Sequence, residues 1–296
     1  MSRTPRTTLT ALVAAATLAL AACSGADTPA PAAAQEGPVR IGVVGASDDQ
    51  WKIFEEKAAA AGIDVEITDF TDYQQPNPAT SQDQLDLNQF QHLKFLAEYN
   101  VATDADLVPI AATAVYPLGL YSKQYTSLEE FVAGDEIAIP NDPSNLARAL
   151  LVLQDAGLVE LKDGGSPYST EADVLPTSLV TVTPVDAAQT AIALNSVAAS
   201  IINNDFVADA GLEPTDAIYQ DDAASDAARP YINVWVARAD DQDNPVYAQL
   251  IALYKEQEVQ DALVAGSGGT AVLANQTAAE LQGYLADIVE AAAAQG

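Results

Sequence analysis

Residues 136–157 read EIAIPNDPSNLARALLVLQDAG, and this stretch contains a short apolar strand that runs directly into a helix. Asp142 can cap the helix with Pro143 at its first position, or Ser144 can cap it instead. Gly157 is placed to end the helix, because glycine readily adopts the left-handed conformation that follows a last turn. A strand followed at once by an amphipathic helix is a building unit of α/β proteins, so the stretch predicts an α/β fold.

The same alternation of strands and helices continues on both sides of this stretch. Strand-like runs occur at residues 39–44, 63–70, 106–111, 136–139, 179–182, 200–202 and 231–236. Helical patterns occur between and after them, at residues 49–61, 89–99, 144–156, 186–197, 245–263 and 277–294. A loop rich in Pro, Asn and Gln follows residue 70. The order predicts largely parallel sheets. The roughly 255 residues of the body exceed the usual size of a single core, which predicts two α/β lobes.

The helix in the opening stretch carries one basic side chain, Arg148, on the side away from its apolar face. Leu146 and Leu153 belong to that face, and Arg148 lies about 200° around the helix from Leu146. Ligands of open α/β sheets bind at the carboxyl ends of strands, and a guanidinium suits bidentate capture of a carboxylate. We therefore predict that Arg148 binds a ligand and can be replaced without loss of the fold. The alternative is an ordinary surface arginine that pairs with Asp142 or Asp155.

A second stretch concentrates aromatic side chains among Asn and Gln. Residues 73–96 read YQQPNPATSQDQLDLNQFQHLKFL and include Tyr73, Phe90, His92 and Phe95. Such rings can flank the mouth of a pocket and hold an apolar or thioether side chain, with sulfur–aromatic contacts worth about 0.3–1.5 kcal/mol each. The alternative is that the rings belong to the core of a lobe and that His92, the single histidine of the chain, is a structural residue.

The N-terminus predicts export and lipidation. Two arginines precede an apolar run at residues 9–20, which is too short to span a bilayer core of about 30 Å. Two alanines then lead to Cys23, the only cysteine of the chain, as in a bacterial lipobox. We predict a signal peptide over residues 1–22, then a lipidated Cys23 that begins a flexible tether over residues 23–38. The alternative is an ordinary secretory signal with an incidental cysteine.

The composition argues against several functional classes. Acidic residues outnumber basic residues by 42 to 12, whereas a nucleic-acid-binding protein needs Lys and Arg to neutralise phosphates. The sequence contains no H-E-x-x-H motif, no G-x-S-x-G motif and no glycine-rich phosphate loop. We therefore expect a protein that is not an enzyme, with no catalytic residue, no metal, no cofactor and no nucleic-acid partner.

Several strings, taken in order, resemble the MetQ/NlpA family of methionine-binding lipoproteins. Besides the lipobox they are DYQQPN at 72–77, LDLNQFQHLKFL at 85–96, YPLGLYSKQYTSLEE at 116–130, AIPNDPSNLARALLVLQDAGLVEL at 138–161, SIINNDF at 200–206 and PYINVWVAR at 230–238. The combination of the fourth string with NQFQH is specific, and the resemblance covers nearly all of residues 39–296.

The resemblance implies a two-lobed periplasmic-binding-protein-like fold of type II with a ligand cleft between the lobes. Lobe one would comprise residues 39–113 and 234–296, and lobe two residues 114–233. The carboxylate of the ligand would pair with Arg148, its polar groups would meet Asn203 and Asn233, and its side chain would lie among the four aromatic residues named above. The resemblance further implies a protein held by its lipid on the outer face of the cell membrane, which passes methionine to the permease and ATPase of an ABC importer.

Two departures from the family pattern leave the ligand open. Phe95 stands where the family commonly has Tyr, and Ala198 stands where it commonly has Asp. The alternative ligands are D-methionine, another small amino acid or a dipeptide. Two other classes of function also stay open, namely a surface-anchored hydrolase and an interaction protein that binds no small ligand.

Overall fold

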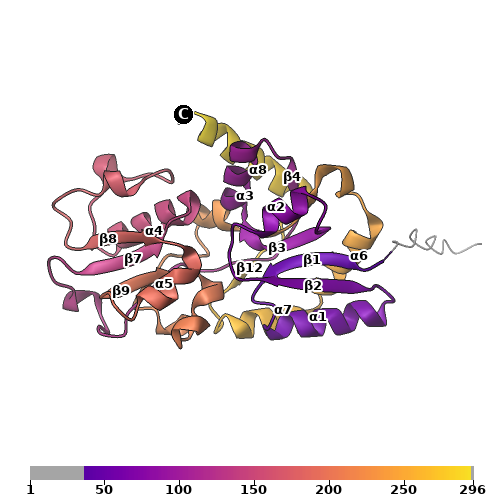
Figure 1. The fold of residues 1–296 in the computed structure, drawn as a ribbon, viewed down its shortest axis with the longest axis horizontal. Coiled ribbons are helices and arrows are strands. Elements are labelled where there is room, and N and C mark those ends of the chain that lie inside the picture. Colours follow the sequence, from indigo (N-terminus) through magenta and orange to yellow (C-terminus); the bar gives the residue numbers. More distant parts are fainter. Residues whose placement is uncertain (1–36, 295–296) are drawn as a thin grey trace, which may run out of the picture. The chain divides into compact units, whose positions relative to one another are not determined.

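The computed structural model describes residues 37–294 (Figure 1). The predicted signal peptide, Cys23 and nearly all of the predicted tether lie outside these residues. In the described part of the chain, no helix combines the length and the apolar character that a membrane crossing requires.

One five-stranded sheet has the strand order β2-β1-β3-β11-β4. Strand β1 pairs in parallel with β2 and β3, whereas β11 is antiparallel to both of its neighbours. We call this sheet and the helices packed around it the first lobe. Its strands are β1 (Val39–Val44), β2 (Val65–Phe70), β3 (Leu87–His92), β4 (Leu107–Ala112) and β11 (Asn233–Arg238), and its helices are α1 (Asp49–Ala60), α2 (Pro76–Ser81), α3 (Leu93–Thr103), α6 (Pro245–Tyr254), α7 (Gln257–Gly266) and α8 (Ala278–Ala293).

A second five-stranded sheet has the order β10-β6-β9-β7-β8. Strand β7 is parallel to β8 and β9, and β6 is antiparallel to β9 and β10. With its helices this sheet forms the second lobe (Figure 1). Its strands are β6 (Gly119–Tyr121), β7 (Glu136–Pro140), β8 (Thr181–Val185), β9 (Ala199–Ile202) and β10 (Tyr219–Gln220), and its helices are α4 (Pro143–Asp155) and α5 (Ala187–Ala193).

The chain passes between the two sheets twice, and these passages lie beside a small third sheet. The first passage follows β4 and leads through β5 (Ala114–Val115) to β6. The second follows β10 and leads to β11. Strand β5 pairs with β12 (Val272–Leu273). We call residues 113–118 and 221–232 the crossover segments, because a change in the angle between the lobes must be absorbed there.

Each lobe has its own apolar core, and a further apolar cluster contains residues of both lobes. The apolar face of α4 packs into the second-lobe core, as predicted. The shared cluster joins Tyr73, Phe90 and Phe95 of the first lobe to Ile202 and Phe206 of the second. The two lobes are therefore in direct apolar contact in this structure.

Local chemistry explains why the ends of α4 match the sequence prediction. The side chain of Asp142 accepts a hydrogen bond from the N–H of Asn145, and Pro143 takes the first helical position, so the alternative cap at Ser144 is wrong. Gly157 follows the last turn with a φ of +74°, a conformation that costs a residue with a Cβ atom more than it costs glycine.

Four of the predicted structural features are wrong. Residues 89–92 belong to strand β3 and not to a helix, residues 76–81 form a helix and not a loop, and the pattern at 245–263 breaks into two helices at Glu256. The sheets are mixed and not largely parallel, because β11 returns from the other lobe and enters the first sheet antiparallel to β3 and β4.

Buried amides explain why β3 does not have the sequence pattern of a strand. All six of its residues are buried, and three of them are Asn or Gln. Gln91 exchanges two hydrogen bonds with Asn77 of α2 at 2.6 and 2.7 Å. Asn88 donates to Asn77 at 3.2 Å and to Thr80 at 2.8 Å. A polar group can be buried without a large penalty when it is hydrogen-bonded in this way, so hydropathy alone does not reveal the strand.

Candidate ligand-binding site

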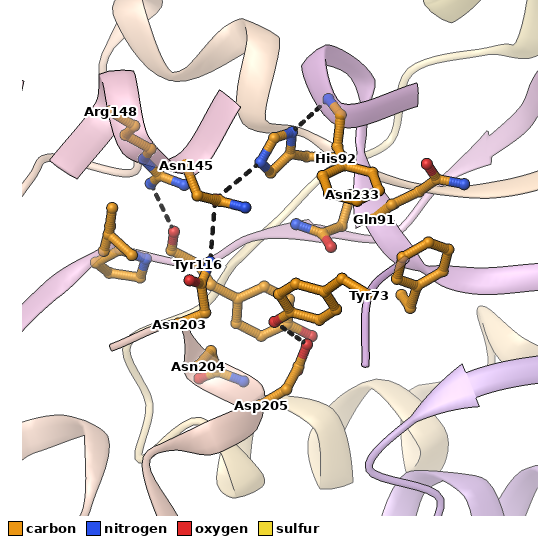
Figure 2. A pocket seen from close by; sticks show the side chains of 14 residues that line it. Tyr73, Gln91, His92, Tyr116, Asn145, Arg148, Asn203, Asn204, Asp205 and Asn233 are labelled. Atoms are coloured by element: carbon orange, nitrogen blue, oxygen red, sulfur yellow. Dashed lines mark hydrogen bonds between the residues drawn. The ribbon is translucent and has the colours of Figure 1, made fainter. Parts of the chain in front are cut away.

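A cavity lined by residues of both lobes lies between them (Figure 2). All seven residues predicted to bind a ligand line this one cavity: Tyr73, Phe90, His92, Phe95, Arg148, Asn203 and Asn233. The structure thus brings the seven together, and their contact with a ligand stays a prediction.

The first lobe supplies an aromatic wall, which we define as Tyr73, Phe90, His92 and Phe95. Tyr73 follows β2, Phe90 and His92 lie on β3, and Phe95 lies in the first turn of α3. The ring centroids of Tyr73 and Phe90 are 5.9 Å apart, and Phe95 stands nearly edge-on to Phe90 at 5.7 Å. Rings at these distances stabilise one another and present a rigid apolar surface to the cavity.

The hydrogen bonds of His92 determine its protonation. Its Nδ1 accepts the backbone N–H of Phe95 at 3.1 Å and so caps α3, which leaves the proton of the neutral ring on Nε2. Nε2 then donates to Oδ1 of Asn145, 3.2 Å away on the second lobe. Burial lowers the pKa of His92 to about 3, and the positive charge of Arg148 acts in the same direction. His92 is therefore a neutral member of the wall at physiological pH.

Arg148 is held from several sides. Its Nε donates to Oδ2 of Asp221 at 2.7 Å, and its Nη2 donates to Oδ1 of Asp221 at 3.1 Å and to the backbone oxygen of Tyr116 at 2.9 Å. The guanidinium also lies 4.2 Å from the ring centre of Tyr231. All three partners belong to the crossover segments. Arg148 thus links the cavity to both places where the chain passes between the lobes.

This arrangement corrects one expectation for Arg148. The residue is only 4% exposed, and its partner is Asp221, so the alternative of a surface arginine paired with Asp142 or Asp155 is wrong. That the fold survives replacement of Arg148 stays a prediction. Its loss would leave the partly buried Asp221 carboxylate without its cationic partner, so we expect the replacement to lower the stability of the fold.

Arg148 and Asn203 each have one side-chain polar atom without a hydrogen-bond partner among residues 37–294. Nη1 of Arg148 makes no hydrogen bond there, although the other two guanidinium nitrogens are engaged. Oδ1 of Asn203 is buried and also lacks a hydrogen bond. An unpaired buried polar group, such as this oxygen, costs free energy until a ligand or water satisfies it. Arg148 and Asn203 thus offer the cavity a free cationic donor and a free acceptor.

A chain of amides holds Asn203 in its orientation. Nδ2 of Asn145 donates to both carboxylate oxygens of Asp142 at 2.9 and 3.0 Å, which directs Oδ1 of Asn145 into the cavity. That oxygen accepts Nδ2 of Asn203 at 3.0 Å (Figure 2). The cap of α4 therefore fixes which way the Asn203 amide points.

Sequence reasoning missed several residues of the cavity. Asn145 stands inside the AIPNDPSN string and could have been found as part of it. Tyr116 and Asp205 line the cavity and likewise stand inside two of the quoted strings, 116–130 and 200–206. Asp221 binds Arg148, and no local pattern marks it. Ala198, one of the two departures from the family pattern, lies in the second-lobe core and is not among the residues that line the cavity.

The model of one protein family, described as NlpA lipoprotein, matches residues 39–274. The chain belongs to the NlpA lipoprotein family. Among its NlpA relatives is the D-methionine-binding lipoprotein MetQ of Yersinia pestis, which is 36% identical over 241 residues that cover 79% of this chain and 87% of that protein. The family resemblance drawn from the sequence strings is thereby confirmed.

Solved structures of NlpA-like proteins agree with the fold. The substrate-binding protein of a methionine transporter from Streptococcus pneumoniae is 35% identical, with a TM-score of 0.74 over 80% of this chain and 95% of that one. A nutrient-binding protein from Burkholderia cenocepacia, solved bound to methionine, is 33% identical, with a TM-score of 0.73 over 80% of this chain and 99% of that one. The chain has their two-lobed periplasmic-binding-protein fold, which confirms the predicted fold class.

Proposed function

We propose that this lipoprotein captures methionine outside the cytoplasm and delivers it to the permease and ATPase of an ABC importer. The observation that carries the proposal is the pairing, in one cavity between two lobes, of an aromatic wall with a free guanidinium nitrogen and a free amide oxygen. The names of the relatives support it, since they include a D-methionine-binding lipoprotein and a protein bound to methionine.

The free atoms match the charges of an amino acid. The carboxylate of methionine would accept from Nη1 of Arg148, and its ammonium would donate to Oδ1 of Asn203, with Asn233 beside them. A carboxylate taken out of water needs such a charged partner, since burial of an unpaired charge is costly. The thioether would lie against the aromatic wall, where sulfur–ring contacts contribute about 0.3–1.5 kcal/mol each. No step of this process requires a catalytic residue, a metal or a cofactor.

The two lobes would open and close around the ligand. We propose lobe boundaries at residues 39–113 with 234–296 for the first lobe and 114–233 for the second, with the hinge in the crossover segments. We further propose that Cys23 carries the lipid anchor and that the protein faces the outside of the cell membrane. The names of its lipoprotein relatives support membrane association.

Mass spectrometry of the full chain, purified from membranes in detergent and then unfolded, tests both parts of this proposal. The intact mass should show acyl chains on Cys23, and about one molecule of methionine per chain should be released. Release of another amino acid or a dipeptide would replace methionine as the ligand. An unmodified Cys23, or no released small molecule together with no uptake of added methionine, would contradict the anchor or the binding function respectively.

A further inference from the structure

One hydrogen bond across the cavity involves a residue to which the proposed function assigns no role. The hydroxyl of Tyr73, in the first lobe, donates to Oδ2 of Asp205, in the second, at 2.7 Å (Figure 2). Asp205 lies in the short turn Asn204–Phe206 that directly follows β9. The bond joins a member of the aromatic wall to the opposite lobe.

The Tyr73 ring is held by packing against neighbouring rings and by the hydrogen bond that its hydroxyl makes. The ring packs against Phe90 and Phe95 of its own lobe and lies 4.9 Å from Phe206 of the second lobe. Tyr73 is 7% exposed, and within residues 37–294 Asp205 is the only hydrogen-bond partner of its hydroxyl. A buried hydroxyl without an acceptor costs free energy, so the closed position of this ring depends on Asp205.

We propose that Asp205 is a positioning residue of the ligand site, which holds Tyr73 against the ligand and latches the lobes in the closed arrangement. Because Asp205 and Tyr73 belong to different lobes, the bond forms only when the lobes close, and the aromatic wall is complete only then. The proposal rests on the proposed function, since it concerns the same cavity and its closure.

The surroundings of Asp205 make the latch sensitive to pH. Asp205 also lines an adjoining cavity together with Asp48 and Glu213, and no Lys or Arg is among the described residues that line this second cavity. Burial raises the pKa of Asp205 to about 7, and the charge of Asp48 acts in the same direction, against the hydrogen bond from Tyr73. In separated lobes the carboxyl would be solvated, with an ordinary pKa of about 3.9.

The direction of the pH effect follows from these values. A group whose pKa is higher in the closed form takes up a proton on closure, so Asp205 favours closure most at low pH. This contribution declines as the pH rises from about 4 to about 7 and is constant above that range. His92 acts in the opposite direction, because burial lowers its pKa to about 3. The other titratable or charged groups that face this region from the elements around it are Asp48, Tyr73, Tyr116, Glu213, Tyr254 and Arg148.

Two substitutions at one position separate the hydrogen bond from the charge. Asp205→Asn keeps an acceptor for the Tyr73 hydroxyl and removes the charge, whereas Asp205→Ala removes both. Asp209→Asn is the matched control, because Asp209 is an exposed carboxylate of the same lobe. Calorimetric titration of ligand-stripped protein with L-methionine at pH 5.5 and pH 8 compares the variants. Comparison of wild type with Asp205→Asn cancels the contribution of His92.

We expect Asp205→Ala to bind L-methionine about tenfold more weakly than Asp205→Asn at both pH values. The affinity of the wild type relative to Asp205→Asn should fall about 30-fold from pH 5.5 to pH 8. Asp209→Asn should behave as the wild type does. Equal affinities of the Ala and Asn variants, or a ratio of wild type to Asp205→Asn that does not change with pH, would overturn the proposal.

A second measurement decides the matter if the wild type binds no methionine and the proposed function fails. The melting temperatures of wild type, Tyr73→Phe, Asp205→Ala and the double variant, each measured as purified with any co-purified ligand left in place, form a double-mutant cycle. A double variant that melts several degrees higher than the sum of the single effects predicts would support the latch. Strict additivity would overturn it.

Discussion

The two walls of the cavity differ in what holds their side chains in place. The aromatic wall comes from one stretch of one lobe, and its rings support one another by packing. The opposite wall is polar, and Arg148 and Asn203 are oriented by partners elsewhere in the chain, namely Asp221 and Asn145. A wall of packed rings selects a ligand by its shape, whereas a wall of oriented polar groups selects a ligand by its charge. We expect Nη1 of Arg148 and Oδ1 of Asn203, which have no hydrogen-bond partner among residues 37–294, to make this selection.

Burial shifts the pKa values of one titratable group on each side of the cavity in opposite directions. His92 in the aromatic wall is kept neutral because burial lowers its pKa to about 3. Asp205 on the other side has a pKa raised to about 7 for the same reason. Burial disfavours whichever form is charged. Arg148 carries the positive charge that the guanidinium of every arginine keeps in proteins, and Asp221 pairs with it.

The largest effect on ligand affinity is expected when the charged residue of the polar wall, Arg148, is replaced. Arg148→Ala should lower the affinity for L-methionine about 30- to 4000-fold, because removal of one partner of a buried charge pair costs about 2–5 kcal/mol. Arg148→Lys should recover only part of this, since an ammonium lacks the planar fork of the guanidinium. Calorimetric titration of ligand-stripped protein measures both variants. Lys162→Ala serves as the control, because Lys162 is an exposed basic residue of the second lobe that does not line the cavity.

Stability must be separated from binding in this series. Arg148→Ala should also lower the free energy of unfolding by about 1–3 kcal/mol, because Asp221 loses its cationic partner and keeps only the hydrogen bond from the N–H of Leu118. The double variant Arg148→Ala/Asp221→Ala should regain part of this stability but none of the affinity. Urea unfolding of each variant gives the stabilities. If folded Arg148→Ala binds within threefold of the wild type, Arg148 is a structural residue only.

A smaller effect on ligand preference is expected from replacing a ring of the aromatic wall, which would contact the ligand by packing and carries no charge. The wild type should prefer L-methionine over L-norleucine, in which a methylene replaces the sulfur, by about fivefold, and Phe90→Leu should reduce this preference to about twofold. Phe54→Leu is the matched control, since Phe54 packs with Trp51 and Trp235 in the first-lobe core away from the cavity. Competition binding with both amino acids gives the preferences. An unchanged preference in Phe90→Leu would mean that the thioether does not contact this wall.

The sequence predicts best those parts of the molecule that short-range chemistry determines. The ends of α4 follow from Asp142, Pro143 and Gly157, because each of these residues affects only the helical turn next to it. The aromatic wall could be found because its members stand close together in the chain. The length of the chain predicts two lobes, whereas the cleft between them and the roles of Asn203 and Asn233 are implied only by the family resemblance.

The missing parts depend on contacts between distant residues. Asp221 is 73 positions from Arg148, and Asp205 is 132 positions from Tyr73, so neither pairing leaves a periodic signal. Strand β3 was misread because its buried amides satisfy one another, which only the folded arrangement reveals. The predicted roles of Cys23 and of the tether concern residues outside the described part of the chain.

The central claim is that one cavity recognises both the charge and the side chain of methionine. Calorimetric titration of ligand-stripped wild type with L-methionine and with L-methioninol, in which a hydroxymethyl group replaces the carboxylate, tests it most directly. We expect one site per chain for L-methionine and binding of L-methioninol at least about 30-fold weaker, because Nη1 of Arg148 loses its charged partner. Absence of saturable heat with L-methionine, or equal affinity for the two compounds, would contradict the account.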